Sequence, residues 1–193
     1  MSEAGGANDL LAVIDAVVTV FEREGIRYFV TGSFASSMHG EFRATNDLDI
    51  VATLDPPHLA SALRALSHDF IVDVDQARAA IEAGSSFNLI HRIAYMKVDI
   101  FPSISGFDAE QTRRAETVSL PGIAGPFRVA TKEDVLLAKL RWYRLGGETS
   151  EVQRRDIHRL IELNTGSFDN DYVQAWARQL AVSDLLERFR GYP

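Results

Sequence analysis

The sequence predicts an α+β fold: a short mixed β-sheet flanked by helices, followed by a helical C-terminal part. Before residue 128, short apolar or alternating runs typical of strands are interspersed with segments of helical spacing. After Thr131 only helical patterns follow. We therefore expect a core at residues 1–127 and a helical subdomain at residues 128–193.

Composition is typical of a water-soluble globular protein. The 193 residues are enough for one sizeable core with a small helical addition, and 46% of them are hydrophobic. The absence of cysteine excludes disulfides, cysteine-ligated zinc and cysteine nucleophiles. The sequence has neither the cationic and apolar start of a secretory signal nor an apolar run near the ~18 residues of a membrane span. We expect no membrane association and a cytoplasmic location.

The chain is acidic, with a net charge of −7. Proteins that bind nucleic acid through its phosphates usually present a basic face, so this charge weighs against non-specific nucleic-acid binding. A local basic patch in the C-terminal part is still compatible with the sequence, because arginines gather there at Arg141, Arg144, Arg154, Arg155 and Arg159.

The first half of the chain alternates between helices and strands. Asn8 or Asp9 is a good N-cap for a first helix, which Gly25 is placed to end. Proline is tolerated in the first turn of a helix, which supports a helix from residue 57. The elements expected up to residue 91 are a strand at 26–31, a helix at 34–39, a strand at 47–53, a helix at 57–66, a strand at 70–74, a helix at 76–83 and a strand at 87–91.

The second half begins with a strand at 93–101, which we expect to pair with the strand at 87–91. Residues 102–127 are rich in Gly, Ser and Pro, and predict a loop with one short helix at 109–115. Thr131 followed three positions later by Asp134 resembles a capping box and predicts a helix at 132–145. Further helices are expected at 150–163 and, one or two, between residues 171 and 190.

Asp47 and Asp49 stand two apart on a predicted strand, so their carboxylates project from the same face. Two neighbouring buried carboxylates repel each other, and a cation would offset that cost. Magnesium prefers a few carboxylates together with substrate phosphates. The pair therefore indicates a magnesium site, although such a pair by itself is also common at solvated strand ends.

Asp99 lies in the later apolar strand predicted at 93–101, where it shares a face with Ile93, Tyr95 and Lys97. An Asp in so apolar a strand is explained if that strand lies beside Asp47 and Asp49. Three carboxylates around one or two metal ions can activate a hydroxyl and neutralise a leaving pyrophosphate. The alternative is a hydrogen-bonded structural aspartate.

Gly32 and Ser33 follow the first predicted strand and precede a helix. Glycine permits a close approach of the backbone, and amides at the start of a helix bind phosphate oxygens. The serine hydroxyl adds a further hydrogen bond. We therefore predict a triphosphate site here, in a position that is more often an ordinary loop.

Taken together, these residues resemble the DNA polymerase beta-like nucleotidyltransferase superfamily, whose pattern is Gly-Ser, a gap, Asp-x-Asp and a later Asp. The segment RATNDLDI resembles the branch of abortive-infection (AbiEii-like) toxins and small antibiotic nucleotidyltransferases. The resemblance covers residues 26–101 and implies that Gly32 and Ser33 hold the triphosphate while Asp47, Asp49 and Asp99 bind one or two Mg²⁺ ions. It also implies a nucleoside triphosphate such as ATP as co-substrate.

The toxin-like branch also has a lysine on a helix after the core and an Arg-Asp pair on the next helix. Here these would be Lys139, which could contact triphosphate oxygens, and Asp156, which could orient Lys139 or act near the acceptor. Each could equally be a surface residue of its helix. Arg43 and Thr45 either touch the nucleotide or position the Asp-x-Asp strand. Trp142 either packs the two parts together or lies near a base.

The function expected from this resemblance is transfer of a nucleoside monophosphate to an acceptor, which could be a small molecule, a protein side chain or an RNA end. The alternative is a catalytically silent binding or regulatory protein with the same fold, for example a toxin–antitoxin component. An unrelated metal-dependent hydrolase would not explain Gly32 and Ser33. Since the chain leaves little room for an acceptor domain, a homodimer or a cognate antitoxin is a further candidate partner.

Overall fold

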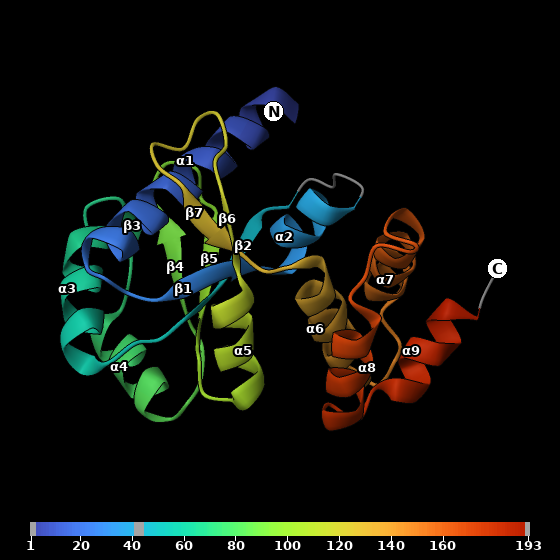
Figure 1. Ribbon diagram of the computed structural model, residues 1–193. Coiled ribbons are helices and arrows are strands. Elements are labelled where there is room, and N and C mark those ends of the chain that lie inside the picture. The colour runs from blue at the N-terminus through green and yellow to red at the C-terminus, as the bar shows by residue number, and fades with distance from the viewer. Residues whose placement is uncertain (1–2, 41–44, 192–193) are drawn as a thin grey trace.

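The structure, a computed structural model, describes residues 3–40 and 45–191 and confirms the predicted α+β fold (Figure 1). Strands are confined to the part before residue 130, and helices follow. The elements in chain order are α1 (Glu3–Arg23), β1 (Tyr28–Thr31), α2 (Gly32–His39), β2 (Asp47–Ala52), α3 (Pro56–Leu66), β3 (Phe70–Ile71), α4 (Val74–Glu82), β4 (Phe87–His91), β5 (Lys97–Pro102), α5 (Gly106–Arg114), β6 (Glu116–Val118), β7 (Phe127–Val129), α6 (Lys132–Leu145), α7 (Glu151–Leu163), α8 (Asn170–Gln179) and α9 (Ser183–Arg190).

Within the described residues the strands form one seven-stranded sheet in the order β3-β4-β5-β2-β1-β7-β6. Strands β2 and β5 pair in parallel, as do β1 and β7, whereas the other neighbours are antiparallel. The sheet is therefore mixed, as predicted. Because parallel neighbours need a crossover connection, the chain between β2 and β5 leaves the sheet centre and returns through α3, β3, α4 and β4.

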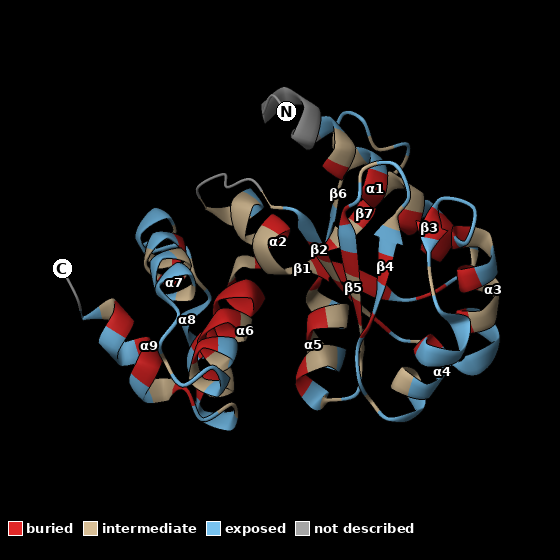
Figure 2. Ribbon diagram, turned by 180° about the vertical axis from the view of Figure 1, so that it is seen from behind, coloured by how far each residue is buried: buried red, intermediate tan, exposed pale blue. Residues whose placement is uncertain are grey.

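One face of the central strands is fully buried. Leu48 and Ile50 of β2, and Val98 and Ile100 of β5, are 0% exposed. They alternate with the aspartates along both strands, as the period of two in a strand requires. Figure 2 shows this buried layer running through the sheet, and α6 is also buried over most of its length. The carboxylates consequently project from the opposite face.

Helix α6 joins the C-terminal helices to the sheet. It packs against α2 as well as α7 and α8, and Val135, Leu136, Leu137 and Leu140 on it are almost completely buried. The cluster of buried apolar residues runs from α1 to α9 without a break between the two parts. The expected boundary between residues 127 and 128 falls inside β7. Separate core and helical domains therefore stay a prediction.

Several predicted bounds were wrong. Helix α1 begins at Glu3 instead of after Asn8 or Asp9, since a capping preference does not stop a helix from extending further back. Strand β3 ends at Ile71, because the Asp73 side chain accepts a hydrogen bond from the Gln76 amide and begins α4. Helix α5 begins at Gly106 instead of residue 109.

Strand β5 begins at Lys97 instead of residue 93. Residues 92–94 form a turn, and Tyr95 has a positive φ of 54°. Ile93 and Tyr95 are 83% and 80% exposed, so they do not share a strand face with Asp99. The predicted loop at 102–127 also contains β6 and the first residue of β7, two three-residue strands too short to give a periodic signal.

Among the helices of the described residues, none is both long enough and apolar enough to cross a lipid bilayer.

Candidate active site

The register of the central strands brings two of the predicted carboxylates together. Asp49 of β2 lies directly opposite Asp99 of parallel β5. The same row continues to Thr31 on β1 and to Asn88 on β4. Neighbouring strands lie ~4.8 Å apart, so side chains on one face of such a row are direct neighbours. The sheet therefore forms an acidic pair at its centre.

Asp47 and Lys97 form the next row on the same two strands. Asp47 is exposed, and the Lys97 ammonium lies 2.8 Å from Asp99 Oδ2. The hydrogen bond to Asp99 raises the pKa of Lys97, and the charges of Asp99, Asp47 and Asp49 act in the same direction. Lys97 thus supplies positive charge within the acidic group. Its ion pair with Asp99 was not among the predicted contacts.

Gly32 lies against the Asp49 carboxylate. Its φ is +65°, a conformation that side chains rarely adopt. A Cβ atom placed there would stand 1.9 Å from Asp49 Oδ2. The preceding N-cap, Thr31, makes no side-chain capping bond to α2. Amides of the first helical turn have no partners within their helix, so this backbone offers donors beside the acidic pair.

Asp49 is the most perturbed of these carboxylates. Its pKa is raised to about 6, first by burial and then by the nearby charges of Asp99 and Asp47, while Lys139 and Lys97 act to lower it. Like charges crowded in a partly buried place favour the neutral acid, or the anion together with an added cation. Perturbed carboxylates of this type are typical of functional sites.

Lys139 and Asp156 form a buried ion pair between α6 and α7. The Lys139 Nζ atom donates to Asp156 Oδ2 at 2.9 Å, and the two side chains are 7% and 11% exposed. The sequence-based alternative that Lys139 is a solvated surface residue is therefore wrong. The pair holds an ammonium group close enough to lower the pKa of Asp49.

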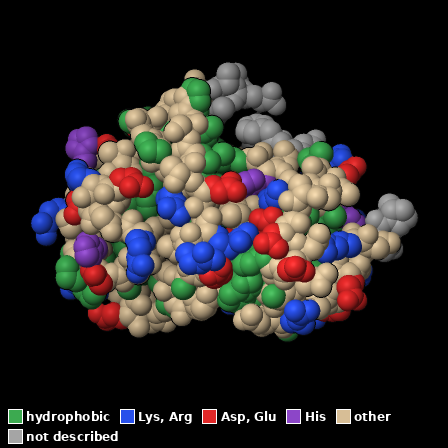
Figure 3. Space-filling view, in the orientation of Figure 1, with side chains coloured by type: hydrophobic (Ala, Val, Ile, Leu, Met, Phe, Trp, Pro, Cys, Tyr) green, Lys and Arg blue, Asp and Glu red, His purple; other side chains and the backbone are tan. Residues whose placement is uncertain are grey.

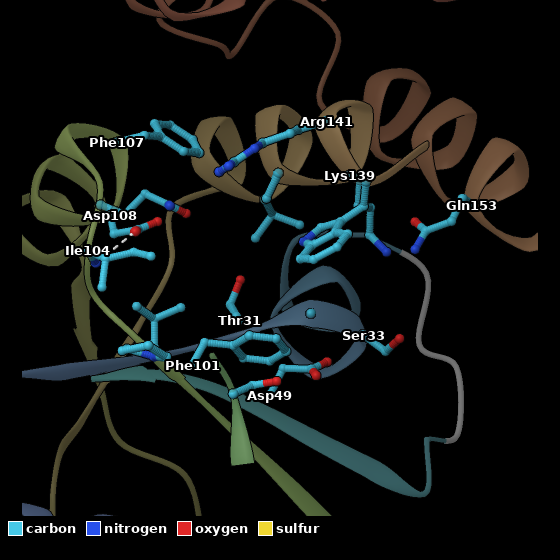
Figure 4. Close-up of a pocket in the computed structure, with 18 of the residues that line it drawn as sticks. Thr31, Ser33, Asp49, Phe101, Ile104, Phe107, Asp108, Lys139, Arg141 and Gln153 are labelled. Carbon is cyan, nitrogen blue, oxygen red and sulfur yellow. Dashed lines mark hydrogen bonds between the residues drawn. The ribbon is translucent and has the colours of Figure 1, made fainter. Parts of the chain in front are cut away.

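A cavity of about 440 Å³ opens between the sheet, α5 and α6. Gly32, Ser33 and Asp49 line one end, and Lys139 lines it from α6. Figure 4 shows Thr31 and Asp49 on the floor of the cavity and Arg141 extending across its roof towards Phe107. Further lining residues that sequence analysis did not predict are Phe101, Ile104, Asp108, Gln111 and Gln153. The cavity joins the predicted phosphate end to a second end with aromatic and amide side chains.

The structure does not bring all the predicted residues to the cavity. Arg43 lies outside the described residues. The Thr45 hydroxyl donates to the Asp47 carbonyl at 3.0 Å and accepts from the Asp47 amide at 3.3 Å, so Thr45 fixes the start of β2. Asp47, Asp99 and Asp156 are not among the residues that line the cavity in the described part of the chain. Their roles stay predictions.

A metal ion requires several ligand side chains that converge on one point. No group of three or more acidic or histidine side chains in the described part of the chain is arranged to hold a metal ion. Two features nevertheless suit a divalent cation: the like-charged pair of Asp49 and Asp99, and the close approach of the Gly32 backbone to the Asp49 carboxylate, which a side chain at position 32 would displace. Carboxylate oxygens are ligands that suit magnesium. In this structure, however, the Asp99 carboxylate forms an ion pair with Lys97.

Comparison with known proteins identifies the fold. An antigenic nucleotidyltransferase-like protein from Paracoccidioides brasiliensis aligns over 93% of this chain and 92% of its own, with a TM-score of 0.51 and 16% identity. The chain has the nucleotidyltransferase fold. ANT(2")-Ia in complex with adenylyl-2"-tobramycin gives a TM-score of 0.55 at 11% identity, over 89% of this chain and 97% of the other.

A third structure with the nucleotidyltransferase fold is the lincosamide antibiotic adenylyltransferase LnuA, lincomycin-bound. It has a TM-score of 0.52 and 20% identity, over 84% of this chain and 98% of its own. No protein-family model and no curated protein sequence matches the chain. At such identities the likeness establishes the nucleotidyltransferase fold, and the resemblance to the abortive-infection branch stays a prediction.

Proposed function

We propose that the protein is a magnesium-dependent nucleotidyltransferase. It transfers a nucleoside monophosphate from a nucleoside triphosphate to an acceptor hydroxyl or phosphate. The acceptor oxygen bonds to the α-phosphorus, the bond from that phosphorus to the β-bridging oxygen breaks, and pyrophosphate leaves. The observation that carries this proposal is the pairing of Asp49 with Asp99, together with the close contact of the Gly32 backbone with the Asp49 carboxylate.

The phosphate end of the site is assigned to the backbone at Gly32 and Ser33 and to Lys139. The amides donate to phosphate oxygens, and the serine hydroxyl adds a donor. Lys139 supplies a positive charge at this end, and Asp156 holds its ammonium in place. Positioning and charge neutralisation are the main contributions of a protein to phosphoryl transfer.

Asp47, Asp49 and Asp99 would hold one or two Mg²⁺ ions, whose bound charge neutralises the triphosphate and lowers the pKa of the attacking hydroxyl. Of these residues, Asp99 is assigned to take the proton of that hydroxyl, since it lies directly opposite Asp49 on the neighbouring strand. Lys97 holds the Asp99 carboxylate in its orientation through their ion pair.

ATP is the proposed donor, because two proteins of the same fold are an adenylyltransferase and a complex with an adenylyl product. A small hydroxyl-bearing molecule is the first acceptor to test, since those structures contain tobramycin and lincomycin groups. Protein side chains and RNA ends follow, with RNA disfavoured by the net charge of −7.

The test is calorimetric titration of each nucleoside triphosphate, with and without Mg²⁺, into the wild type and the Asp47→Ala/Asp49→Ala double variant. We expect magnesium-dependent binding of ATP that the double variant loses. An acceptor screen with pyrophosphate release as the readout then follows. If well-folded wild-type protein binds no triphosphate at all, the enzyme proposal is wrong.

The second candidate function is a catalytically silent protein that binds a ligand or a partner through this fold. The ion pair between Lys97 and Asp99 favours it, because an ammonium in the acidic group opposes a cation. The Lys97→Met variant separates the two functions. An enzyme binds Mg²⁺ more tightly in Lys97→Met than in the wild type, whereas a silent protein binds none in either form.

A further inference from the structure

Gln111 presents an unpaired acceptor to the cavity. It lies on α5, is only 4% exposed, and lines the cavity. Figure 4 shows α5, at Phe107 and Asp108, across the cavity from Ser33. Its Oε1 atom is buried and has no hydrogen-bond partner among the described residues. A buried polar atom without a partner costs free energy, and such atoms are rare in folded proteins. A ligand that donates a hydrogen bond here would remove that cost.

The walls of the cavity suit a flat ring. Phe101 of β5 and Trp142 of α6 both line the cavity, with their ring centroids 6.4 Å apart. Phe107 lines it one helical turn before Gln111, and its ring is held from behind by Trp176 at 5.1 Å. Aromatic side chains bind nucleobases by stacking on their faces. The cavity thus combines planar apolar surfaces with the unpaired acceptor of Gln111.

The charges at this end disfavour a cationic ligand. The Arg141 side chain extends over the same part of the cavity, as Figure 4 shows. The carboxylate of Asp108 accepts hydrogen bonds from the backbone amides of Ser105 at 2.8 Å and Ile104 at 3.1 Å. The negative charge present is therefore already engaged by the start of α5. A neutral ring fits this end better than an amine-rich acceptor.

We propose that Gln111 determines which nucleobase the site accepts, by receiving a hydrogen bond from the exocyclic 6-amino group of adenine. The proposal rests on the proposed function, because the triphosphate must lie at Gly32 and Ser33 for the base to reach α5. Both ends line one continuous cavity. A glutamine carboxamide is a common partner of the adenine edge in protein–nucleic acid contacts.

The experiment compares two probes in calorimetric titrations with Mg²⁺: ATP, and purine riboside triphosphate, which differs only by lacking the 6-amino group. Wild-type protein is expected to bind ATP about ten-fold more tightly, because sites built around a ligand's donor reject the analogue without it. Gln111→Met, which has a similar length but no acceptor, is expected to bind both probes with the same affinity. Gln111→Glu keeps the acceptor and keeps the preference for ATP.

Gln153 offers a matched control, since its Oε1 atom is also unpaired among the described residues and lines the same cavity from α7. Gln153→Met is expected to retain the wild-type ratio of the two affinities, whatever its effect on both. Equal binding of the two probes by wild type would overturn the role of Gln111 and leave the proposed function standing. Binding of neither probe would overturn both. The wild-type comparison decides even if Gln111→Met does not fold.

Discussion

Two constraints select glycine at position 32, and they can be separated. One is the φ of +65°, and the other is the contact with Asp49 Oδ2 that a Cβ atom would make at 1.9 Å. Gly25 has a similar φ of +68°, but a Cβ atom added there would meet nothing within 4 Å. The two glycines therefore share the conformational constraint and differ only in the contact with the carboxylate.

We expect Gly32→Ala to lower the free energy of unfolding by more than ~2 kcal/mol, and Gly25→Ala by ~1 kcal/mol. The difference reflects displacement of Asp49, so Gly32→Ala should also lose magnesium-dependent ATP binding. Urea unfolding and calorimetry check both effects. Equal destabilisation by the two variants would show that the carboxylate moves aside at little cost.

The raised pKa of Asp49 predicts a pH-dependent stability. A carboxyl with a pKa of about 6 when folded and ~3.9 when unfolded binds its proton more tightly in the folded state. Its contribution to stability is therefore present below pH ~4, falls as the pH rises towards 6, and is lost above that. In metal-free buffer at pH ~7.5 we expect Asp49→Asn to be more stable than wild type by ~1–2 kcal/mol, allowing for partial solvent screening.

Urea unfolding at pH ~7.5 and pH ~4.5 measures this effect, and the advantage of Asp49→Asn should fall to about a third at the lower pH. Glu82→Gln, an exposed change on α4, serves as the control and should behave like wild type at both values. A variant less stable than wild type at the higher pH would mean that Asp49 is already satisfied as an anion.

At the residue scale the sequence predicted which residues form the acidic pair better than it predicted the neighbours of that pair. Parity puts both carboxylates on the same face of apolar strands and is visible in a sequence, whereas the position of Asp49 opposite Asp99 depends on the register between β2 and β5, which is not. Lys97 stands two residues before Asp99 on the same strand face, which is visible in the sequence, but a strand pattern does not show whether the lysine turns towards that carboxylate or into solvent. Gln111 gave no signal, since nothing in a polar helix residue marks it as buried.

A polar network ties α5, α6 and α8 together at the element scale. Asp134 of α6 is 0% exposed, and it accepts hydrogen bonds from the Thr131 hydroxyl at 3.0 Å and the Tyr172 hydroxyl at 2.5 Å. The Arg114 guanidinium lies 3.7 Å from the centre of the Tyr172 ring and 3.7 Å from the Asp134 carboxylate. Burial raises the pKa of Asp134, while these hydrogen bonds and the Arg114 charge oppose that shift.

We expect Tyr172→Phe to lower the free energy of unfolding by ~2 kcal/mol, because it removes a donor from a buried carboxylate while keeping the ring under Arg114. Glu151→Gln breaks an exposed ion pair with Arg154 on α7 and should leave the free energy of unfolding unchanged within error. Urea unfolding at neutral pH distinguishes the two. An effect of Tyr172→Phe no larger than that of Glu151→Gln would show that the hydroxyl contributes nothing to holding α8 on α6.

Elements were predictable where a local signal marked their ends. Helix α6 spans the predicted 132–145, because Thr131 caps it by accepting from the Asp134 amide. Strands β6 and β7 were missed because each has three residues and is held by pairing with a partner rather than by its own pattern. Strand β5 starts later than predicted because the chain turns before it, at Tyr95. The alternating residues on both sides of this turn look like one continuous strand in the sequence.

Over the whole molecule, the two predicted parts share one core. Leu136, Leu137 and Leu140 of α6 are completely buried, and α6 packs on α2. Figure 3 shows acidic and basic side chains interspersed over one face, without a division in charge between the parts. Because burial of a large side chain contributes ~2 kcal/mol, loss of α6 would remove much of the small net stability of such a chain.

We therefore expect a chain of residues 1–127 to lack a cooperative urea transition, while the chain of residues 1–191 unfolds in one step. Circular dichroism and fluorescence in urea provide the measurement. A cooperative transition for residues 1–127 would instead support two domains that fold independently, with α6 as an added layer.

The crossover between β2 and β5 has an evolutionary consequence. The opposition of Asp49 and Asp99 is set by the ladder between the two strands, whereas the 44 residues at 53–96 only have to leave and return. Insertions and deletions in the turns of that connection can therefore accumulate without moving a carboxylate. A single-residue deletion within β5 itself would put an apolar side chain beside Asp49. Descendants of this chain are free to vary the length of the connection, but not the spacing inside either strand.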